Sequence, residues 1–491
     1  MAANLPVLQV ILPLLAAPLC LVLRRPAWIW PFAVCVTSAT LAVSFGLLLQ
    51  VMQQGTISYA MGGWAPPWGI EYRVDEISAL VLLIVSAIGA VVMVYAGPSV
   101  KRELPAHKQM AFFAAYLLCL AGLLGISITG DIFNVYVFLE ISALATYTLI
   151  SLGSDRRALT AAFQYLIMGT LGATFILIGI GLMYVMTGTL NMQDMAELLP
   201  AVIETRTIHS AFAFLTVGIC LKLALFPLHL WLPNAYTYAP SAVTAFIAAT
   251  ATKVAIYILL RFTLTVFGAG FSFGVMPLGE SLLVLSLLAI LSGSVTAIYQ
   301  DNIKRMLAWS SLAQIGYIIL GISLATVTGV TAGILHLFNH ALMKGGLFLA
   351  LGCIVFRYGG ARIENFRGLG KTMPWTMAAI VGGGLSLIGV PLTVGFVSKW
   401  YLVLAALEKG WWPVAAFVLM GSLLSVVYIW RLVEAAYFQQ PAEGQVADEA
   451  PWKLLLPTWV LIGASIYFGI HTELTIGVAT RAAEALMGAA P

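Results

Sequence analysis

The sequence predicts an all-α polytopic membrane protein with about 14 transmembrane helices. Two observations carry this prediction. Hydrophobic residues make up 61% of the chain and charged residues only 9%, with a mean hydropathy of +0.99, which is far from the balance of a soluble domain. Apolar stretches of about 18 or more residues also recur from one end of the chain to the other. No stretch has the composition of a soluble domain.

Each predicted span is an apolar stretch close to the roughly 20 residues that a helix needs to cross a bilayer. In chain order, the spans are expected at residues 6–23, 28–52, 75–98, 110–129, 131–152, 159–187, 209–227, 241–262, 277–299, 303–324, 327–356, 374–406, 411–438 and 453–471. The N-terminus lacks the basic region and the small-residue cleavage site of a signal peptide, so residues 6–23 are expected to be a retained first span.

Lysines and arginines gather in every second loop of this map, as expected if those loops face the cytoplasm. The basic loops contain Arg24, Arg25, Lys101, Arg102, Lys108, Arg156, Arg157, Lys304, Arg305, Arg357, Arg362, Arg367, Lys371, Arg431 and Lys453. The loops of the opposite side hold only Arg73, Arg206, Arg261, Lys409 and Arg481. We therefore expect a multi-pass protein of the cell inner (cytoplasmic) membrane, with both termini on the outer face.

The chain is expected to divide into four parts. These are the first three helices (1–109), a first five-helix repeat (110–265), a second five-helix repeat (277–438), and a C-terminal loop with the last helix (439–491). Two prolines suggest the repeats. Pro227 interrupts the seventh predicted span and Pro391 interrupts the twelfth, five spans later. Paired broken helices are typical of inverted repeats in transporters. Residues 53–72 are expected to form an external loop, 188–206 an amphipathic surface segment, and 439–452 a polar stretch.

Five ionisable residues are expected deep in the membrane: Glu140, Lys222, Lys253, Lys344 and Lys399. A charge at that depth costs roughly 3 kcal/mol or more unless it is partnered or hydrated. One carboxylate cannot neutralise four lysines, so several of the lysines must be neutral part of the time or hydrated. Burial favours a neutral lysine and an approaching carboxylate favours the charged form, and both effects suit a proton path. The alternative for each residue is a static buried ion pair or a lysine that snorkels to the surface.

His336, His340 and Lys344 recur at intervals of four and therefore share one face of the eleventh span. Imidazole titrates near neutral pH, which favours a role in proton relay, whereas the alternative is that each is a hydrogen-bonded core histidine. A metal pair is disfavoured because no third ligand is expected nearby. Asn339 is a candidate for a hydrogen bond across a helix gap. His229 directly follows the first interrupted span and either caps backbone carbonyls or bridges water to the cytoplasm.

The five cysteines lie singly in apolar runs, so neither a disulfide framework nor a thiolate metal site is expected. The chain also lacks a Gly-rich phosphate loop and a cluster of redox ligands. We expect no cofactor, no bound metal and no nucleic-acid partner.

Four stretches together resemble the antiporter-like subunits shared by respiratory complex I, membrane-bound hydrogenases and Mrp-type cation/proton antiporters. They are Lys222 to Arg261, Asp301 to Tyr317, His336 to Lys344, and Gly389 to Trp400. The resemblance covers roughly residues 70–440 with the motifs in the same order, and within the superfamily the chain looks most like the D subunit of an Mrp-type Na⁺/H⁺ antiporter.

The resemblance implies a lateral hydrophilic axis along the membrane midplane. In such an axis Glu140 pairs with Lys222 of the broken seventh helix, and Lys253 passes protons to the centre. The resemblance makes His336 and His340 the central link, and Lys399 of the broken twelfth helix the terminal station.

Two departures from the family pattern reduce the number of subunit types that the chain resembles. Where many relatives have Pro-Asp-Ala-His after the first broken helix, this chain has Pro233-Asn-Ala-Tyr236, and Tyr238 stands at the next acidic position. This argues against the larger complex I and A-type subunits, and against proton uptake through an aspartate or histidine there. The lysine at Lys399, in place of glutamate, speaks against one of the three complex I paralogues.

Three functions stay open on the sequence alone. The first is the proton-translocating subunit of a multisubunit Na⁺/H⁺ antiporter, a secondary transporter with other membrane subunits as partners and with protons and Na⁺ as transported ions. The second is the proton-pumping membrane subunit of complex I or of a membrane-bound hydrogenase. The third, a purely structural scaffold, is disfavoured because four buried lysines are a costly way to build one.

Overall fold

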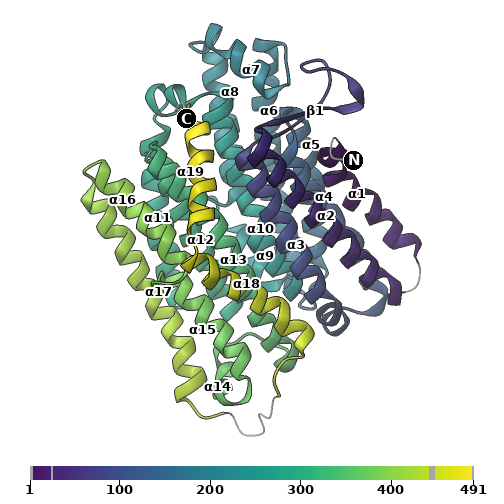
Figure 1. The fold of residues 1–491 in the computed structure, drawn as a ribbon. Helices are drawn as coiled ribbons and strands as arrows, with labels where there is room; N and C mark the ends of the chain where they lie inside the picture. The colour runs from purple at the N-terminus through teal and green to yellow at the C-terminus, as the bar shows by residue number, and fades with distance from the viewer. Residues whose placement is uncertain (1–3, 24–25, 442–447, 489–491) are drawn as a thin grey trace.

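The computed structural model describes residues 4–23, 26–441 and 448–488. Arg24 and Arg25, the first basic pair of the orientation argument, lie outside the described residues, as does the 442–447 part of the predicted polar stretch. The described chain is a bundle of long helices with one small hairpin (Figure 1).

The first half of the bundle contains α1 (Leu5–Val22), α2 (Pro26–Gln54), α3 (Glu76–Glu103), α4 (Ala106–Ile128), α5 (Ile132–Ser151), α6 (Arg157–Thr187), α7 (Met192–Leu198), α8 (Arg206–Leu223), α9 (Trp231–Tyr238) and α10 (Ser241–Leu260). The second half contains α11 (Leu278–Ile298), α12 (Ile303–Ser323), α13 (Val327–Tyr358), α14 (Leu369–Thr372), α15 (Pro374–Ile388), α16 (Val394–Glu408), α17 (Trp412–Phe438), α18 (Trp452–Ile470) and α19 (Glu473–Met487). Two π-helical turns, η4 (Arg261–Val266) and η5 (Gly270–Val275), connect the halves, and three 3₁₀ turns occur at η2 (Met61–Gly63), η3 (Leu199–Ala201) and η6 (Ile363–Phe366).

Among the described residues, thirteen helices are long and apolar enough to cross a membrane. The interrupted pair α15 and α16 occupies the remaining predicted span, 374–406, so the span map from the sequence is confirmed. Polar side chains cap the N-termini of several of these helices by accepting a hydrogen bond from a backbone N–H of the first turn. They include Asp75 before α3, Asp131 before α5, Asn302 before α12 and Thr326 before α13.

Both predicted interruptions are present. Helix α8 ends at Leu223, shortly before the expected end of its span at residue 227, and α9 begins only at Trp231. The second interruption separates α15 from α16, where Gly389 adopts a φ of 92° that favours glycine. Gly395 is needed for a different reason, because a Cβ there would lie 1.7 Å from the Ser386 carbonyl oxygen. The two half-helices therefore approach each other backbone to backbone.

Two features at the upper end of Figure 1 were not predicted from the sequence. Residues 53–72, expected as a loop, contain strand β1 (Ile57–Ala60) and lead into β2 (Glu71–Val74), which pairs with it antiparallel from Ile57 opposite Val74 to Ala60 opposite Glu71. Helix α19 was not expected at all. In Figure 1, α18 runs obliquely across the lower half of the bundle and α19 continues to the upper end, where α1 also begins. The expected surface segment 188–206 does contain a short helix, α7.

Helices α10, α12 and α13 lie in the core of the bundle and are almost entirely buried. Helix α8 packs on α10, α10 packs on α13, and α13 packs on α16. These contacts place the four helices that carry the predicted lysines in one continuous row through the protein.

Candidate functional site: a buried row of lysines and histidines

The row begins at a buried ion pair between α5 and α8. Lys222 lies in the last turn of α8, directly before the first interruption, and its side chain is 6% exposed. Its Nζ lies 3.5 Å from Oε1 of Glu140, whose side chain is 26% exposed. At this distance the contact is a loose ion pair, longer than the roughly 2.7–2.9 Å of a charge-assisted hydrogen bond. The pair has room to tighten or separate.

A small cavity lies beside Lys222 on the side of α10. Its volume is about 30 Å³, which is enough room for a water molecule. The lining includes the polar groups of Ser142, Thr146, Tyr165 and Lys222, together with apolar residues of α4 and α10. A single water there would have several polar partners and would extend the path from Lys222 toward the helix that carries Lys253.

Lys253 sits in the middle of α10 and is fully buried. Its ammonium donates hydrogen bonds to the Ala248 carbonyl and, at 3.4 Å, to the Thr252 hydroxyl, both on its own helix. An ammonium has three protons to donate. Among the described residues Lys253 has no carboxylate partner, so its charge is supported only by backbone and hydroxyl dipoles.

The centre of the row is the face of α13 that the sequence identified. His336 is hydrogen-bonded at both nitrogens: Nδ1 lies 2.8 Å from the Ser398 hydroxyl on α16, and Nε2 lies 2.9 Å from Oε1 of Gln314 on α12. The His340 ring is 6.3 Å from the His336 ring and nearly parallel to it. Both nitrogens of His340 are buried and have no partner among the described residues. Buried polar atoms nearly always have a hydrogen-bond partner, so we expect ordered water beside the His340 ring.

Lys344 is fully buried one turn beyond His340, and its ammonium donates to the Leu307 carbonyl at 2.9 Å and to the Ser310 hydroxyl, both on α12. Lys344 therefore connects the face of α13 that carries His340 to α12.

The row ends at Lys399 in the second interruption. Its Nζ donates to the Leu387 carbonyl at 3.0 Å, to the Ile388 carbonyl at 2.9 Å and to the Ser422 hydroxyl at 2.9 Å. The two carbonyls are free because α15 ends there and they have no helical partner. Lys399 also lies 4.8 Å from the centre of the Tyr317 ring, which adds a cation–π contact. All three ammonium protons are thus accepted, which fits a charged lysine held by a broken helix.

Two further predicted residues lie at the interruptions. Asn339 donates to the Val394 carbonyl at 2.6 Å, so the expected hydrogen bond across a helix gap is present at the second interruption. His229 lies in the first interruption, where its ring packs against Phe226 and Trp309. Its Nδ1 is buried and has no partner among the described residues. Both alternatives for His229, a cap on backbone carbonyls and a water bridge to the cytoplasm, stay predictions.

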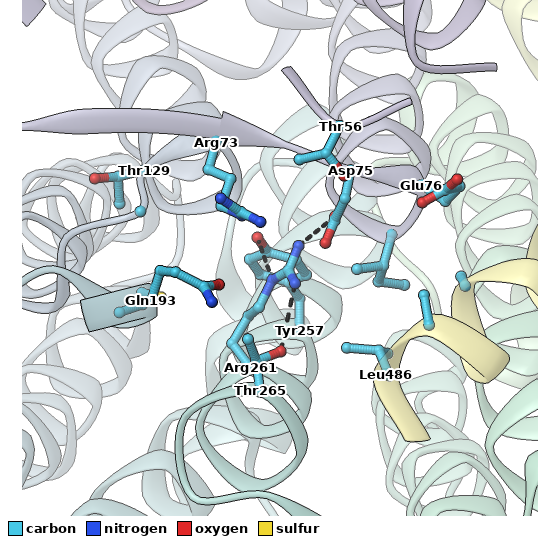
Figure 2. Close-up of a pocket in the computed structure, with 15 residues that line it drawn as sticks. Thr56, Arg73, Asp75, Glu76, Thr129, Gln193, Tyr257, Arg261, Thr265 and Leu486 are labelled. Carbon is cyan, nitrogen blue, oxygen red and sulfur yellow. Dashed lines mark hydrogen bonds and ion pairs between the residues drawn. The ribbon is translucent and has the colours of Figure 1, made fainter. Parts of the chain in front are cut away.

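The uncharged groups that position these residues were not predicted from the sequence: Gln314, Ser398, Ser422, Ser310 and Tyr317. A polar network at the C-terminal end of α10, shown in Figure 2, was also missed. There Arg261 forms an ion pair with Asp75, and its Nε donates to the Tyr257 hydroxyl at 2.9 Å. The signal that was available is the spacing of Lys253, Tyr257 and Arg261 at intervals of four.

The chain has extensive matches among known proteins. It is 42% identical to the N subunit of an NADH-quinone oxidoreductase from Desulforudis audaxviator, with 97% of each sequence covered. It is 28% identical to the D subunit of a Na⁺/H⁺ antiporter from Bacillus subtilis, over 99% of this chain and 97% of that one.

Solved structures match over the whole length. A chain of the Mrp complex from Dietzia superimposes with a TM-score of 0.91 at 28% identity, and a chain of the archaeal membrane-bound sulfane sulfur reductase with a TM-score of 0.89 at 32% identity. In both cases 99% of this chain and 97% of the other chain are covered. Residues 129–425, which include the row from Glu140 to Lys399, match the transmembrane family described as NADH:quinone oxidoreductase/Mrp antiporter. The chain belongs to this family of antiporter-like membrane subunits.

Proposed function

We propose that this chain moves protons within the membrane, along the row that starts at Glu140 and Lys222 and passes through Lys253 and the α13 histidines to Lys399. The observation that carries the proposal is the imbalance of charge in the row. Four buried lysines face one carboxylate, Glu140, and the other lysines are held by carbonyl and hydroxyl oxygens. Lysines in that setting can gain and lose a proton without breaking a fixed ion pair.

The loose Glu140–Lys222 pair controls whether Lys222 holds or releases its proton. When Glu140 lies close, its charge stabilises the proton on Lys222; when it moves away, burial favours the neutral amine. The proton then passes through the small cavity toward Lys253, and the amine of Lys222 is free to take up another. A proton that reaches Lys253 creates a buried charge without a carboxylate beside it, which favours its transfer onward to the α13 histidines.

His340 and His336 connect the two halves of the row. In the arrangement described, Gln314 accepts from the Nε2–H of His336, and Ser398 donates to Nδ1 of the neutral ring or accepts from the charged one. His336 therefore has a donor and an acceptor on opposite sides, which is what a relay residue needs. His340, whose ring nitrogens have no partner within the described part of the chain, supplies the second such station.

We further propose that the protein works within a multisubunit complex of the cell inner membrane, with both chain ends on the outer face. The related proteins support this, because their names are those of subunits of respiratory and antiporter complexes. The row also ends at two lateral surfaces. Glu140 is part exposed, and Leu392 and Trp400 beside the second interruption are 66% and 52% exposed apolar residues that a neighbouring subunit would cover. The division into inverted five-helix repeats, 110–265 and 277–438, stays part of this proposal.

For the coupling of proton movement, the first candidate is Na⁺/H⁺ antiport. The likeness to the Mrp complex and to the D subunit of the antiporter supports it. The chain itself is then the proton carrier, since Glu140 is already committed to Lys222 and buried Na⁺ needs several oxygen ligands. The cation path is expected in, or at the boundary with, a neighbouring subunit.

The second candidate is coupling to a redox enzyme. It is favoured by the 42% identity to a protein named for NADH–quinone oxidoreduction and by the likeness to a sulfane sulfur reductase complex. The same row would serve, with electron transfer in other subunits as the source of energy.

The test uses the whole complex purified through a tag on this chain and reconstituted in vesicles. Proton movement driven by an imposed Na⁺ gradient supports antiport, whereas proton movement that requires an electron donor and acceptor supports the redox candidate. Proton movement under neither condition, by a complex with all its subunits present, contradicts the proposed function. Reconstitution of the chain alone is the control, because Na⁺/H⁺ exchange without partners would contradict the assignment of the cation path to a neighbour.

A further inference from the structure

A pocket opens at the end of the bundle where the hairpin, α7 and the end of α19 meet (Figure 2). Its volume is about 230 Å³, enough for several water molecules. The charged groups that face it are Arg73, Asp75, Glu76 and Arg261, so the formal charges balance. By the orientation proposed above, this end faces the outer aqueous phase.

The floor of the pocket is a network of hydrogen bonds that joins the start of α3 to the end of α10. Arg261 pairs with Asp75 and donates to the Ser78 hydroxyl at 2.7 Å and to the Tyr257 hydroxyl at 2.9 Å. Ser78 Oγ and Tyr257 Oη lie 2.9 Å apart, and Tyr257 donates to the Ser127 carbonyl at 3.1 Å. Arg261 opens a π-helical turn, a rare geometry that occurs most often at functional sites.

Lys253, Tyr257 and Arg261 lie at intervals of four and therefore on one face of α10. Four residues of helix rise about 6 Å, which is about the reach of an extended lysine side chain. Lys253 points the other way in the structure described, because it bonds Ala248 five residues before it. Proton exchange with Tyr257 therefore requires Lys253 to leave this rotamer and to turn its ammonium toward the C-terminal end of α10.

We propose that the pocket is an outer proton port, through which Lys253 exchanges protons with the outer aqueous phase by way of the Tyr257 and Ser78 hydroxyls. This inference rests on the proposed function, since it assumes that Lys253 carries protons, and it adds a second opening to a row whose ends lie at the lateral surfaces. The conformation described is the one in which Lys253 is turned away from the port.

The proton transfer balances without any other reactant. The Lys253 ammonium gives one proton to the Tyr257 oxygen and becomes a neutral amine. Tyr257 turns its own hydroxyl proton away from the Ser127 carbonyl and releases it to water in the pocket, either directly or through Ser78, which accepts that proton and passes its own hydroxyl proton to the water. Each hydroxyl is both a donor and an acceptor, so neither residue changes charge overall. Arg261 stays protonated throughout and does not relay. Its pairing with Asp75 cancels the positive charge that would otherwise repel a proton from the port.

The first test replaces the bridging hydroxyl. Tyr257→Phe keeps the ring and removes the oxygen, so we expect proton movement by the reconstituted complex to fall at least tenfold while all subunits remain assembled. Tyr116→Phe is the matched control. Tyr116 is also a fully buried tyrosine, and it donates to the Gly89 carbonyl at 2.9 Å, away from the pocket. Proton movement in Tyr257→Phe equal to that of Tyr116→Phe would overturn the port.

The second test measures access. In a Cys35→Ser background, Thr265→Cys places a thiol on the pocket wall, and a charged, membrane-impermeant thiol reagent applied to the outer side should label it and block proton movement. Thr263→Cys is the control, because Thr263 is 1% exposed two residues away on the same π-helical turn. Labelling of Thr265→Cys only from the cytoplasmic side would overturn the port.

The failure of the port is distinguishable from the failure of the proposed function. If Tyr257→Phe and labelled Thr265→Cys both move protons normally while Lys253→Ala does not, Lys253 is a proton station and the port is wrong. If Lys253→Ala also moves protons normally, the proposed proton path along the row is contradicted, and the proposed port is contradicted with it.

Discussion

Lys222 and Glu140 are held 3.5 Å apart by two different helices, and Lys222 lies where one of those helices is interrupted. Ala224, which follows α8, adopts a left-handed conformation, so the helix cannot continue past it. The lysine is therefore fixed to the end of a half-helix, while the carboxylate is fixed to the continuous helix α5. A small tilt of either helix changes the separation of the two charges, which makes the pair suitable as a switch.

Glu140→Gln tests this switch. The substitution keeps the shape of the side chain and a hydrogen-bond acceptor but removes the charge that stabilises protonated Lys222. We expect coupled proton movement by the reconstituted complex to fall more than tenfold with normal expression and assembly. Glu280→Gln is the control, because Glu280 lies in the first turn of α11, away from the row. Transport above half of the wild-type value in Glu140→Gln would show that the pair is structural.

Lys253→Ala tests the middle of the row. The substitution removes the lysine between Lys222 and the α13 histidines, and proton transfer needs a donor and an acceptor within hydrogen-bond reach of each other. We expect the complex to assemble and to lose coupled proton movement, measured with a pH-sensitive dye inside vesicles. Lys409→Ala is matched in chemistry but lies in a surface loop, where it contacts Trp411, and it should transport normally. Equal transport by the two variants would remove Lys253 from the path.

The Asp75–Arg261 pair predicts a pH dependence of stability. Burial raises the pKa of Asp75, but the charge of Arg261 and the hydrogen bonds from Arg261 and Ser78 outweigh it and hold the pKa below its usual value. A carboxyl whose folded-state pKa is lowered contributes stability above its unfolded pKa of about 3.9, and this contribution is lost as pH falls through the folded value. Asp75→Asn should therefore destabilise the protein at pH 7 by about 3 kcal/mol, because it leaves Arg261 buried without its partner.

Thermal unfolding of the purified chain in detergent, at pH 7 and near pH 3, measures this effect. The difference between wild type and Asp75→Asn should be largest at pH 7 and should shrink in acid. Asp155→Asn is the control, because Asp155 pairs with Arg157 at the exposed start of α6, where ion pairs contribute little to stability. A difference that is the same at both pH values would show that the carboxylate charge of Asp75 does not matter.

The sequence was sufficient to predict the span map and both interruptions, since apolar length and proline position depend only on local residue type. It also identified the charged members of the row, because a charge in an apolar span is rare. It was not sufficient for Gln314, Ser398 and Ser422. Uncharged polar side chains occur in many of the helices, and which of them face a lysine or histidine of the row depends on how each helix is rotated in the bundle.

Helix α19 was missed for a different reason. It has 15 residues, fewer than the roughly 18 of a recognisable span, and it is amphipathic, with a buried alanine-rich face. Only its packing along α13 and α3 holds it against the bundle. The hairpin was missed because its two strands are separated by ten residues rich in glycine, proline and tryptophan, which give no short-turn signal.

The last prediction concerns Lys399, where the row reaches the second interruption. Lys399→Ala removes a proton carrier whose ammonium is held by two carbonyls of α15 and by Ser422. We expect coupled transport to be abolished in that variant. Lys399→Glu should retain a measurable fraction, because a carboxylic acid also holds a proton and donates it to the same carbonyls, whereas Lys399→Met, with similar length and no titratable group, should be as inactive as alanine.

Ser422→Ala separates positioning from proton transfer at this end of the row. It removes one of the three acceptors and leaves the two carbonyls, so the charged form of Lys399 becomes less favourable while the lysine remains. We expect transport in Ser422→Ala to be retained at low pH and reduced at high pH, with the midpoint of the pH profile shifted downward relative to wild type. Ser425→Ala, one turn along α17, is the control, since Ser425 contacts Tyr428 rather than Lys399. An unshifted profile in Ser422→Ala, or normal transport in Lys399→Ala, would mean that protons leave the row before they reach the second interruption.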